Sequence, residues 1–208
     1  CYWYEQMADG NYAITSTDGW HDGWNISQKS PDYQCYRYSD GTWAYGWKFI
    51  DGTWYYFDDA GYVVYGWKAL KTSSDGVWRW WYFSPVHDGT FGAMITGWQK
   101  IGDSWYYLEP NDGPLQGSMV EGLRDIDGET YFFAPNQGSM VTGWYHDKTE
   151  DRDNWFFFDD AGHMVKNRVI AVTTDGKTSA FAEDGRMVEG TATIATDENG
   201  YITDVKHV

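Results

Sequence analysis

The side chains that could do chemistry in this sequence are aromatic rings. Its 208 residues include 14 Trp, 17 Tyr and 10 Phe. The electron-rich face of such a ring attracts cations, and each close contact contributes about 0.5–2 kcal/mol. The 31 acidic residues against 15 basic ones give a net charge of −16. That charge is compatible with a cationic ligand, and it disfavours nucleic acid or an anionic membrane surface as a partner.

Catalytic and metal-binding patterns are missing from the sequence. The five His residues, at positions 21, 87, 146, 163 and 207, lack the spacing of known metal motifs. No Ser or Cys nucleophile motif occurs. Asp pairs such as Asp58–Asp59 recur at the same point of successive units, which is typical of turn residues. The sequence predicts a non-catalytic chain with no metal and no cofactor, and leaves open whether an enzyme domain is attached in the full-length protein.

The stretch from Gly46 to Gly66 reads as one β-hairpin followed by a loop. The Asp51–Gly52 pair is a strong signal for a type I′ turn, which needs positive φ at both central residues. The return strand, Thr53–Phe57, is rich in the aromatics that suit a pleated surface. A lone hairpin is marginally stable in water, so both of its faces require neighbours.

Similar units repeat along the chain, each marked by a Gly-Trp pair or its equivalent. The marks are Gly23, Gly46, Gly66, Gly97, Gly122, Gly143, Asn167 and Gly190. The period is about twenty residues, with insertions. The sequence therefore predicts an all-β fold of stacked hairpins, forming a single array over 1–208. It comprises a partial unit at 1–22, about seven repeats over 23–190 and a capping hairpin at 191–208, because the end units of an array meet water.

Insertions lengthen four loops, at 71–77, 84–91, 110–116 and 147–153. Such segments are expected to face outward. The chain has two cysteines, Cys1 and Cys35, in similar local strings; either a disulfide or two thiols fits the sequence. No apolar run is long enough to span a bilayer, and no signal peptide is present in these residues.

The repeated pattern is Gly-Trp, a short strand, a turn, Trp-Tyr-Tyr-Phe and a closing Gly-x-Met. It resembles the choline-binding, or cell-wall-binding, repeat of bacterial surface proteins and murein hydrolases. It is carried by Gly46–Trp47, Gly97–Trp98 and Gly143–Trp144 with their return strands. Glucan-binding and clostridial-toxin repeats share part of the pattern. The resemblance implies a β-solenoid of hairpins, in a protein secreted to the bacterial cell surface.

The resemblance also implies ligand sites between consecutive hairpins, each built from two Trp of one hairpin and an aromatic residue of the next, with a Met beside them. Three sets fit: Trp47 and Trp54 with Tyr82, near Met94; Trp67 and Trp80 with Tyr107, near Met119; and Trp98 and Trp105 with Phe132, near Met140. Elsewhere Leu123 and Thr130 replace the two Trp of one unit, and Trp144 with Trp155 meets only Ala180. The same rings could instead pack in the core without binding a ligand.

Three functions remain open at this stage. The first is a wall-attachment module that binds choline on teichoic acids. The second is a module that stacks glucan or another carbohydrate on the same rings, although uncharged sugars need polar partners beside the ring. The third is a scaffold or adhesin that binds a protein partner through the inserted loops. The oligomeric state is not predicted.

Overall fold

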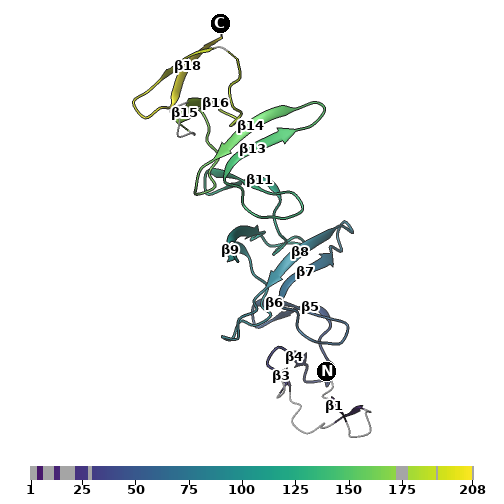
Figure 1. Cartoon of the computed structure of the whole chain (residues 1–208). Coiled ribbons are helices and arrows are strands. Elements are labelled where there is room, and N and C mark those ends of the chain that lie inside the picture. Colours follow the sequence, from purple (N-terminus) through teal and green to yellow (C-terminus); the bar gives the residue numbers. More distant parts are fainter. Residues whose placement is uncertain are drawn as a thin grey trace. The chain divides into compact units, whose positions relative to one another are not determined.

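The chain folds entirely from β-hairpins in the part that the structure describes. The computed structural model describes residues 4–6, 12–14, 22–27, 30–171, 178–190 and 192–207. Within these residues there is no helix, and the strands pair two by two, each with its neighbour in sequence (Figure 1). The prediction of an all-β array of hairpins is confirmed. Contacts group the chain into two compact units: Cys1–Gln99 with Leu108–Met119, and Lys100–Tyr107 with Val120–Val208.

The hairpins have short strands of three to six residues. The first are β1 (Tyr4–Gln6) with β2 (Tyr12–Ile14), β3 (Gly23–Ile26) with β4 (Gln34–Arg37), β5 (Gly46–Ile50) with β6 (Thr53–Phe57), and β7 (Gly66–Lys71) with β8 (Trp78–Phe83). β9 (Gly97–Ile101) and β10 (Ser104–Leu108) follow. The last are β11 (Gly122–Ile126) with β12 (Glu129–Phe133), β13 (Gly143–Lys148) with β14 (Asp153–Phe158), β15 (Arg168–Ala171) with β16 (Thr178–Phe181), and β17 (Ala192–Thr196) with β18 (Ile202–His207).

The turns have the positive-φ backbone conformations that the sequence predicts. Asp51 and Gly52 have φ of 50° and 83°, so the type I′ turn between β5 and β6 is confirmed. The glycine that begins each repeat unit also has positive φ, from 66° at Gly46 to 95° at Gly23. Asn167, which takes the place of the Gly in its unit, has φ of 48°. Asn is among the few side chains that tolerate this left-handed conformation, which explains why it can replace Gly there.

Six hairpins, from β5–β6 to β15–β16, are each tied to the preceding one by a backbone hydrogen bond. The amide of Met94 donates to the carbonyl of Trp54 at 2.9 Å, and the next amide, of Ile95, donates to Tyr82 of its own hairpin at 2.9 Å. The closing segment thus bonds to two hairpins at once. The same inter-hairpin bond recurs at Val63–Gln34, Met119–Trp80, Met140–Trp105, Met164–Thr130 and Met187–Trp155, at 2.7–2.8 Å.

The core is a series of small clusters between hairpins rather than one centre. The last residue of the return strand is fully buried in hairpin after hairpin: Phe57, Phe83, Leu108, Phe133, Phe158 and Phe181. Phe83 packs with Leu70 and Trp81, and rings of the preceding hairpin cover this cluster. Aromatic residues therefore supply the burial that aliphatic residues provide in most domains.

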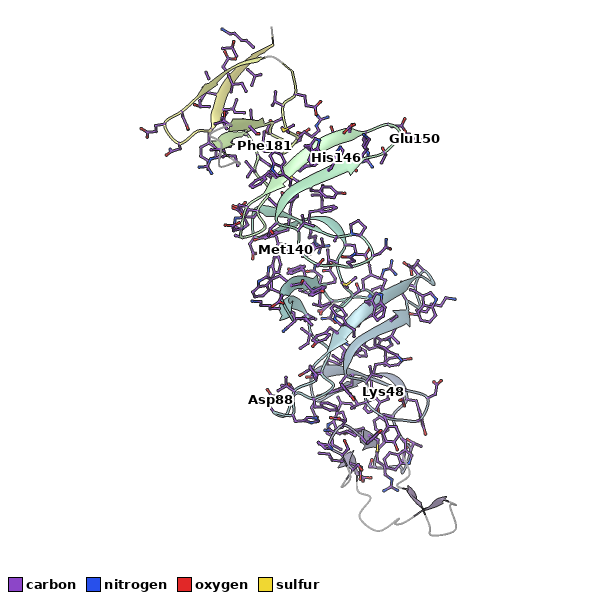
Figure 2. The ribbon with its side chains drawn as sticks, viewed as in Figure 1. Lys48, Asp88, Met140, His146, Glu150 and Phe181 are labelled. Atoms are coloured by element: carbon purple, nitrogen blue, oxygen red, sulfur yellow. The ribbon has the colours of Figure 1, made fainter. Side chains whose placement is uncertain are left out.

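The inserted loops differ in their surroundings. In the 84–91 insertion, His87 stacks on Phe91 at 4.1 Å between ring centroids and meets Asp32 at 2.7 Å. Asp88, in the same loop, and Glu150, at the tip of β13–β14, point outward from the ribbon (Figure 2). The 110–116 insertion instead lines a cavity, as described below.

At the end of the chain, β17–β18 packs on β15. The amide of Val169 donates to Gly200 at 2.9 Å, and the Arg168 guanidinium lies 5.3 Å from the centre of the Tyr201 ring. Cys35 is fully buried, whereas Cys1 lies outside the described residues. Over the same described part of the chain, the search for a helix long and apolar enough to cross a membrane found none.

The buried Phe positions predict a large effect on stability. Phe83→Ala is expected to lower the free energy of unfolding by about 3–5 kcal/mol, because it leaves a cavity in a packed cluster. Phe49→Ala is the control, since Phe49 is 60 % exposed, and it should change stability by no more than about 0.5 kcal/mol. Urea denaturation followed by circular dichroism measures both. Equal losses in the two variants would contradict the layered core.

Candidate ligand-binding site

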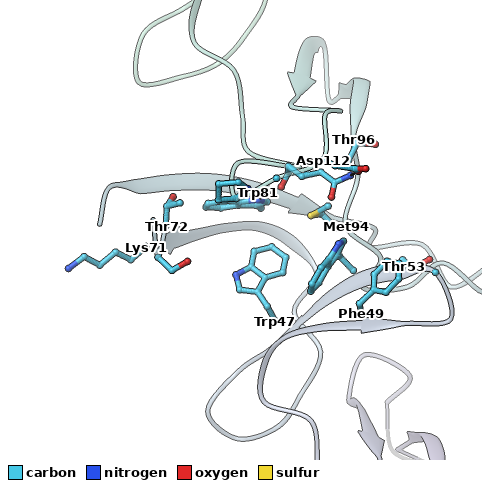
Figure 3. Close-up of a pocket in the computed structure, with 15 residues that line it drawn as sticks. Trp47, Phe49, Thr53, Lys71, Thr72, Trp81, Met94, Thr96 and Asp112 are labelled. Atoms are coloured by element: carbon cyan, nitrogen blue, oxygen red, sulfur yellow. Dashed lines mark hydrogen bonds between the residues drawn. The ribbon is translucent and has the colours of Figure 1, made fainter. Parts of the chain in front are cut away.

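A cavity of about 840 Å³ lies between the β5–β6 and β7–β8 hairpins of the first compact unit. Figure 3 shows Trp47, Phe49 and Thr53 on one side of it, with Trp81, Met94 and Asp112 on the other. The fifteen lining residues come from β5–β6, the tip of β7–β8, Trp81, the 94–96 segment and the 112–116 loop.

Three indoles and a thioether enclose the centre of the cavity. The rings of Trp47 and Trp54 stand nearly at right angles, at 84°, with centroids 6.3 Å apart. The ring of Trp81 lies 5.7 Å from that of Trp47 and is inclined to it by 67°. Trp81 is buried, whereas Trp54 is 37 % exposed at the opening. Met94 lines the same space. The site therefore consists of two nearly perpendicular rings, here called a corner, with the third ring, of Trp81, beside Trp47.

Strand alternation decides which rings meet here. In the β5–β6 register, Trp47 pairs with Tyr56 and Phe49 with Trp54. Trp54 and Tyr56 therefore share a face with Trp47, because alternate side chains point the same way. On β8, Trp81 and Phe83 point back toward this face, and both rings lie 5.7 Å from Trp47.

The third ring is Trp81 and not Tyr82. Tyr82 pairs with Trp67 across β7–β8, its ring lies 5.0 Å from that indole, and it does not line the cavity. In this cavity the position expected for Tyr82 is thus taken by its neighbour Trp81, and a role of Tyr82 in ligand binding stays a prediction. A shift of one position along a strand moves a side chain to the opposite face. The register was already implied by the alternation within β6, which could have identified Trp81.

The other two expected sets each have members in both compact units. Trp67, Trp80 and Met119 belong to the first unit and Tyr107 to the second; Trp98 belongs to the first, and Trp105, Phe132 and Met140 to the second. These two sites stay predictions. Within the second unit, Phe132 is buried against Tyr145, at 4.1 Å between ring centroids. The residues of β10 and β12 at the position of Trp81 are Tyr106 and Tyr131.

A second pair of indoles repeats the corner of the cavity. The rings of Trp144 and Trp155 are 6.0 Å apart at 87°, and Met187 bonds to the Trp155 carbonyl as Met94 does to Trp54. The residue at the position of Trp81 is here Ser179, which brings no ring to the corner. His146 stacks on Trp155 at 4.0 Å and 5°.

In the β11–β12 hairpin, where Leu123 and Thr130 replace the two Trp, the ammonium of Lys166 lies beside Thr130. Leu123 is 58 % exposed, and the hydroxyl of Thr130 accepts a hydrogen bond from the Lys166 ammonium at 2.7 Å. Thr130 in turn donates to Asp125. Lys166 follows Met164 by two residues, as Thr96 of the cavity follows Met94. A polar network thus stands where the first unit has an aromatic corner.

Two loops fix the rim of the cavity. The Trp81 indole donates to the carbonyl of Gln116 at 2.9 Å, which ties the 110–116 insertion to the third ring. At the tip of β7–β8, Arg79 donates to the Thr72 hydroxyl at 2.9 Å and to both oxygens of Asp75. The hydrogen bonds from Arg79 lower the pKa of Asp75 to about 2, so this tip keeps its ion pair throughout the neutral range.

Three segments of the chain match known families of repeats. Residues 120–168 match the family described as a choline-binding repeat, and residues 46–63 and 96–115 match the family described as a cell wall binding repeat. These segments are similar to choline-binding, or cell-wall-binding, repeats. The matched segment 46–63 holds Trp47 and Trp54, the open corner of the cavity. No curated protein sequence matches the chain.

Solved structures of choline-binding proteins share the fold. Choline binding protein F of Streptococcus pneumoniae is 27 % identical with a TM-score of 0.65, over 90 % of this chain and 55 % of that one. CbpJ of S. pneumoniae TIGR4 is 26 % identical with a TM-score of 0.63, over 81 % and 48 %. The modular autolysin LytC of S. pneumoniae, 21 % identical with a TM-score of 0.51 over 99 % and 46 %, shows the fold alone. The chain spans about half the length of these structures.

The close approach of Gly117 predicts a way to perturb the cavity without replacing a ring. A Cβ at Gly117 would lie 2.5 Å from the Met94 sulfur and 3.0 Å from a Trp81 carbon. Gly117→Ala should therefore displace the Met94 side chain and weaken choline binding about two- to fivefold, the equivalent of losing part of one ring contact.

Gly102→Ala is the matched control for this change. Gly102 also has positive φ, but nothing lies within 4 Å of its added Cβ. Both variants should lose about 1–2 kcal/mol of stability from backbone strain, and only Gly117→Ala should lose affinity. Titration with choline, followed by tryptophan fluorescence, compares them. Equal affinities would show that Met94 does not shape the site.

Proposed function

We propose that this chain is a non-catalytic module that attaches its protein to a bacterial cell wall by binding choline on teichoic acids. The observation that carries the proposal is the cavity in which Trp47, Trp54 and Trp81 surround one space with Met94 beside them. No group of three potential metal ligands is found among the described residues, and the proposal requires no metal or cofactor.

The chemistry of the cavity suits a quaternary ammonium. Such a group carries a positive charge and has no hydrogen to donate, so ordinary polar sites cannot hold it well. Ring faces can, through their negative electrostatic potential, with about 0.5–2 kcal/mol for each ring. Three rings together would give a dissociation constant in the roughly millimolar range.

Useful attachment would then come from several sites acting on one polymer. The Trp144–Trp155 pair repeats the two-ring corner of the first cavity without an equivalent of Trp81, and the Trp67–Trp80 and Trp98–Trp105 sets supply further candidates. Linked sites of weak affinity bind a repeating polymer far more tightly than any one of them binds choline. A wall polymer decorated with choline along its length meets this requirement.

Relatives support a surface location and the attachment role. The matched repeats are described as choline-binding and cell wall binding, and a similar structure of choline binding protein F was solved in the presence of a peptidoglycan analogue. LytC is a modular autolysin. Attachment to a catalytic domain in the full-length protein is one role that this module would serve.

A second candidate ligand, an uncharged glucan, is favoured by one observation. Hydroxyl and amide side chains line the cavity beside the rings: Thr53, Thr72, Ser73, Thr96 and Gln116. Sugar rings that stack on indoles need such partners. The titration below compares the two ligands. A protein partner for the inserted loops stays a prediction.

Calorimetric titration with choline and with maltooligosaccharides tests the proposal. Choline is expected to bind and the sugars are not. Trp54→Ala should raise the dissociation constant for choline at this cavity about two- to thirtyfold, the equivalent of one ring contact. Trp78→Ala is the control, because Trp78 is 66 % exposed and lies outside the cavity lining.

Binding of the sugars without binding of choline would show that the ligand is a glucan and not choline. Absence of heat with both, together with unchanged attachment of Trp54→Ala to choline-bearing walls, would remove this cavity from the function. Since other corners could bind choline as well, the comparison is best made in a background that carries Trp67→Ala, Trp98→Ala and Trp144→Ala.

A further inference from the structure

The junction between β11–β12 and β13–β14 keeps two elements of a ligand site without its two Trp. Met164 donates to the Thr130 carbonyl at 2.8 Å, which is the recurring bond between hairpins. Phe156 has the register position that Trp81 has on β8, and it packs on the buried cluster that includes Met164. A Met and a third ring are therefore present, while Leu123 and Thr130 replace the two indoles.

An ammonium of the chain itself lies at the second ring position of this junction. The Lys166 ammonium donates to the Thr130 hydroxyl at 2.7 Å, and that hydroxyl donates to Asp125, its partner in the β11–β12 register. Thr130 is buried, and the Lys166 stem lies against the following unit, 3.5 Å from where a Cβ on Gly185 would be. Contacts from both sides thus hold this side chain at the junction.

Lys166 occupies a position that also contributes to the first cavity. It follows Met164 by two residues, as Thr96 follows Met94. Figure 3 shows Met94 and Thr96 on the same side of that cavity, and both line it together with Trp54. Alternate side chains of an extended segment point the same way. The residue two positions after the closing Met therefore lies near the second ring position of its junction.

At the Trp144–Trp155 corner the equivalent residue is Glu189. Met187 donates to the Trp155 carbonyl at 2.7 Å, and Glu189 follows Met187 by two residues. The Glu189 side chain is exposed, and no ion pair within the described part of the chain uses it. Its carboxylate is thus available to a cation at a corner to which Ser179 brings no ring.

We propose that the residue two positions after the closing Met decides whether a junction accepts an external cation. Lys166 supplies the cation of its own junction, so no methylated ammonium binds there. Glu189 has the opposite effect, because it adds a negative charge beside two indoles. Like charges repel and opposite charges attract at this range. The inference rests on the proposed function and names two residues that determine which junctions of the second compact unit bind the ligand.

Charge reversal at Glu189 tests the inference at a natural pair of rings. The parent chain for this test lacks the other candidate pairs through three substitutions: Trp54→Ala, Trp67→Ala and Trp98→Ala. Calorimetric titration should show choline binding to this parent. Glu189→Gln should weaken it about two- to fivefold, the range of an exposed ion pair, and Glu189→Lys up to about thirtyfold, because the charge is reversed.

Glu198→Lys is the matched control for the charge reversal. It makes the same change of charge in the exposed turn between β17 and β18, and it should leave the choline affinity of the parent unchanged. An equal loss in Glu198→Lys and Glu189→Lys would show that net charge alone decides, and would overturn the inference. A parent that binds no choline, or binds it as tightly after Glu189→Lys, would also overturn it.

Restoring the two rings tests Lys166 directly. Leu123→Trp with Thr130→Trp rebuilds the indoles of the β11–β12 junction, in the parent chain with Trp144→Ala added. With Lys166 kept, this chain should bind no choline, because the internal ammonium takes the place of the ligand. With Lys166→Thr, the residue type at Thr96, choline should bind with a roughly millimolar dissociation constant.

Circular dichroism establishes that both ring-restored chains are folded, and calorimetry compares them. Equal choline binding with Lys166 and with Lys166→Thr would overturn the assignment of Lys166. Binding in neither folded chain would overturn it as well, since the position would then not decide whether the junction is occupied.

The internal contact has a readout that requires no ligand. Lys166→Met keeps most of the stem and removes the ammonium, so it should lower the melting temperature by about 3–10 °C. Lys206→Met is the control, because the Lys206 ammonium is exposed and pairs with Asp204 at the surface; it should lower the melting temperature by less than about 3 °C. A melting temperature of Lys166→Met equal to that of wild type would show that the ammonium does not stabilise the junction.

These measurements separate the inference from the proposed function. If Trp54→Ala weakens choline binding while the Glu189 and Lys166 variants behave as their parents, the first cavity keeps its role and this inference fails. If the wild-type chain binds no choline, the proposed function fails and takes the inference with it.

Discussion

The structure depends on one backbone interaction, the hydrogen bond from the closing segment of a hairpin to the hairpin before it. Met94 bonds to Trp54 in this way, and the same bond recurs five more times within the two compact units. A two-stranded hairpin cannot bury both of its faces and is marginal alone. The recurring bond places the next hairpin directly against the exposed face, and a buried Phe or Leu at the end of the return strand fills the junction.

The same junction creates the ligand-binding corner. The carbonyl that accepts the bond belongs to the second Trp of the corner, and the residue that donates it is the Met beside the rings. Loss of the rings does not disturb the junction. Met164 still bonds to Thr130, where Lys166 supplies an ammonium, and Met187 bonds to Trp155, on which His146 stacks. The junction thus uses backbone atoms and the corner uses side chains of the same residues, so the rings can be replaced while the array is retained.

The first cavity differs from a plain corner of rings because an insertion reaches it. The 110–116 loop is bonded to Trp81 and brings a carboxylate to the lining, while the lengthened tip of β7–β8 brings Lys71, Thr72 and Ser73. These additions place charged and hydroxyl side chains beside the aromatic rings of the cavity.

Much of this could be predicted from the sequence. The glycine marks, the Asp-Gly turn and the aromatic return strands specify hairpins, because backbone conformation at positive φ and side-chain alternation are local properties. The positions of Trp47 and Trp54 on a common face follow from the same local rules. What the sequence left undecided was the ring across the junction: Tyr82 was expected there, and its neighbour Trp81 lines the cavity. Only the tertiary structure shows that Trp81 faces Trp47 and that residues of a distant loop complete the cavity. Contacts between separate hairpins depend on how whole units pack, and no pattern within a single unit records that packing.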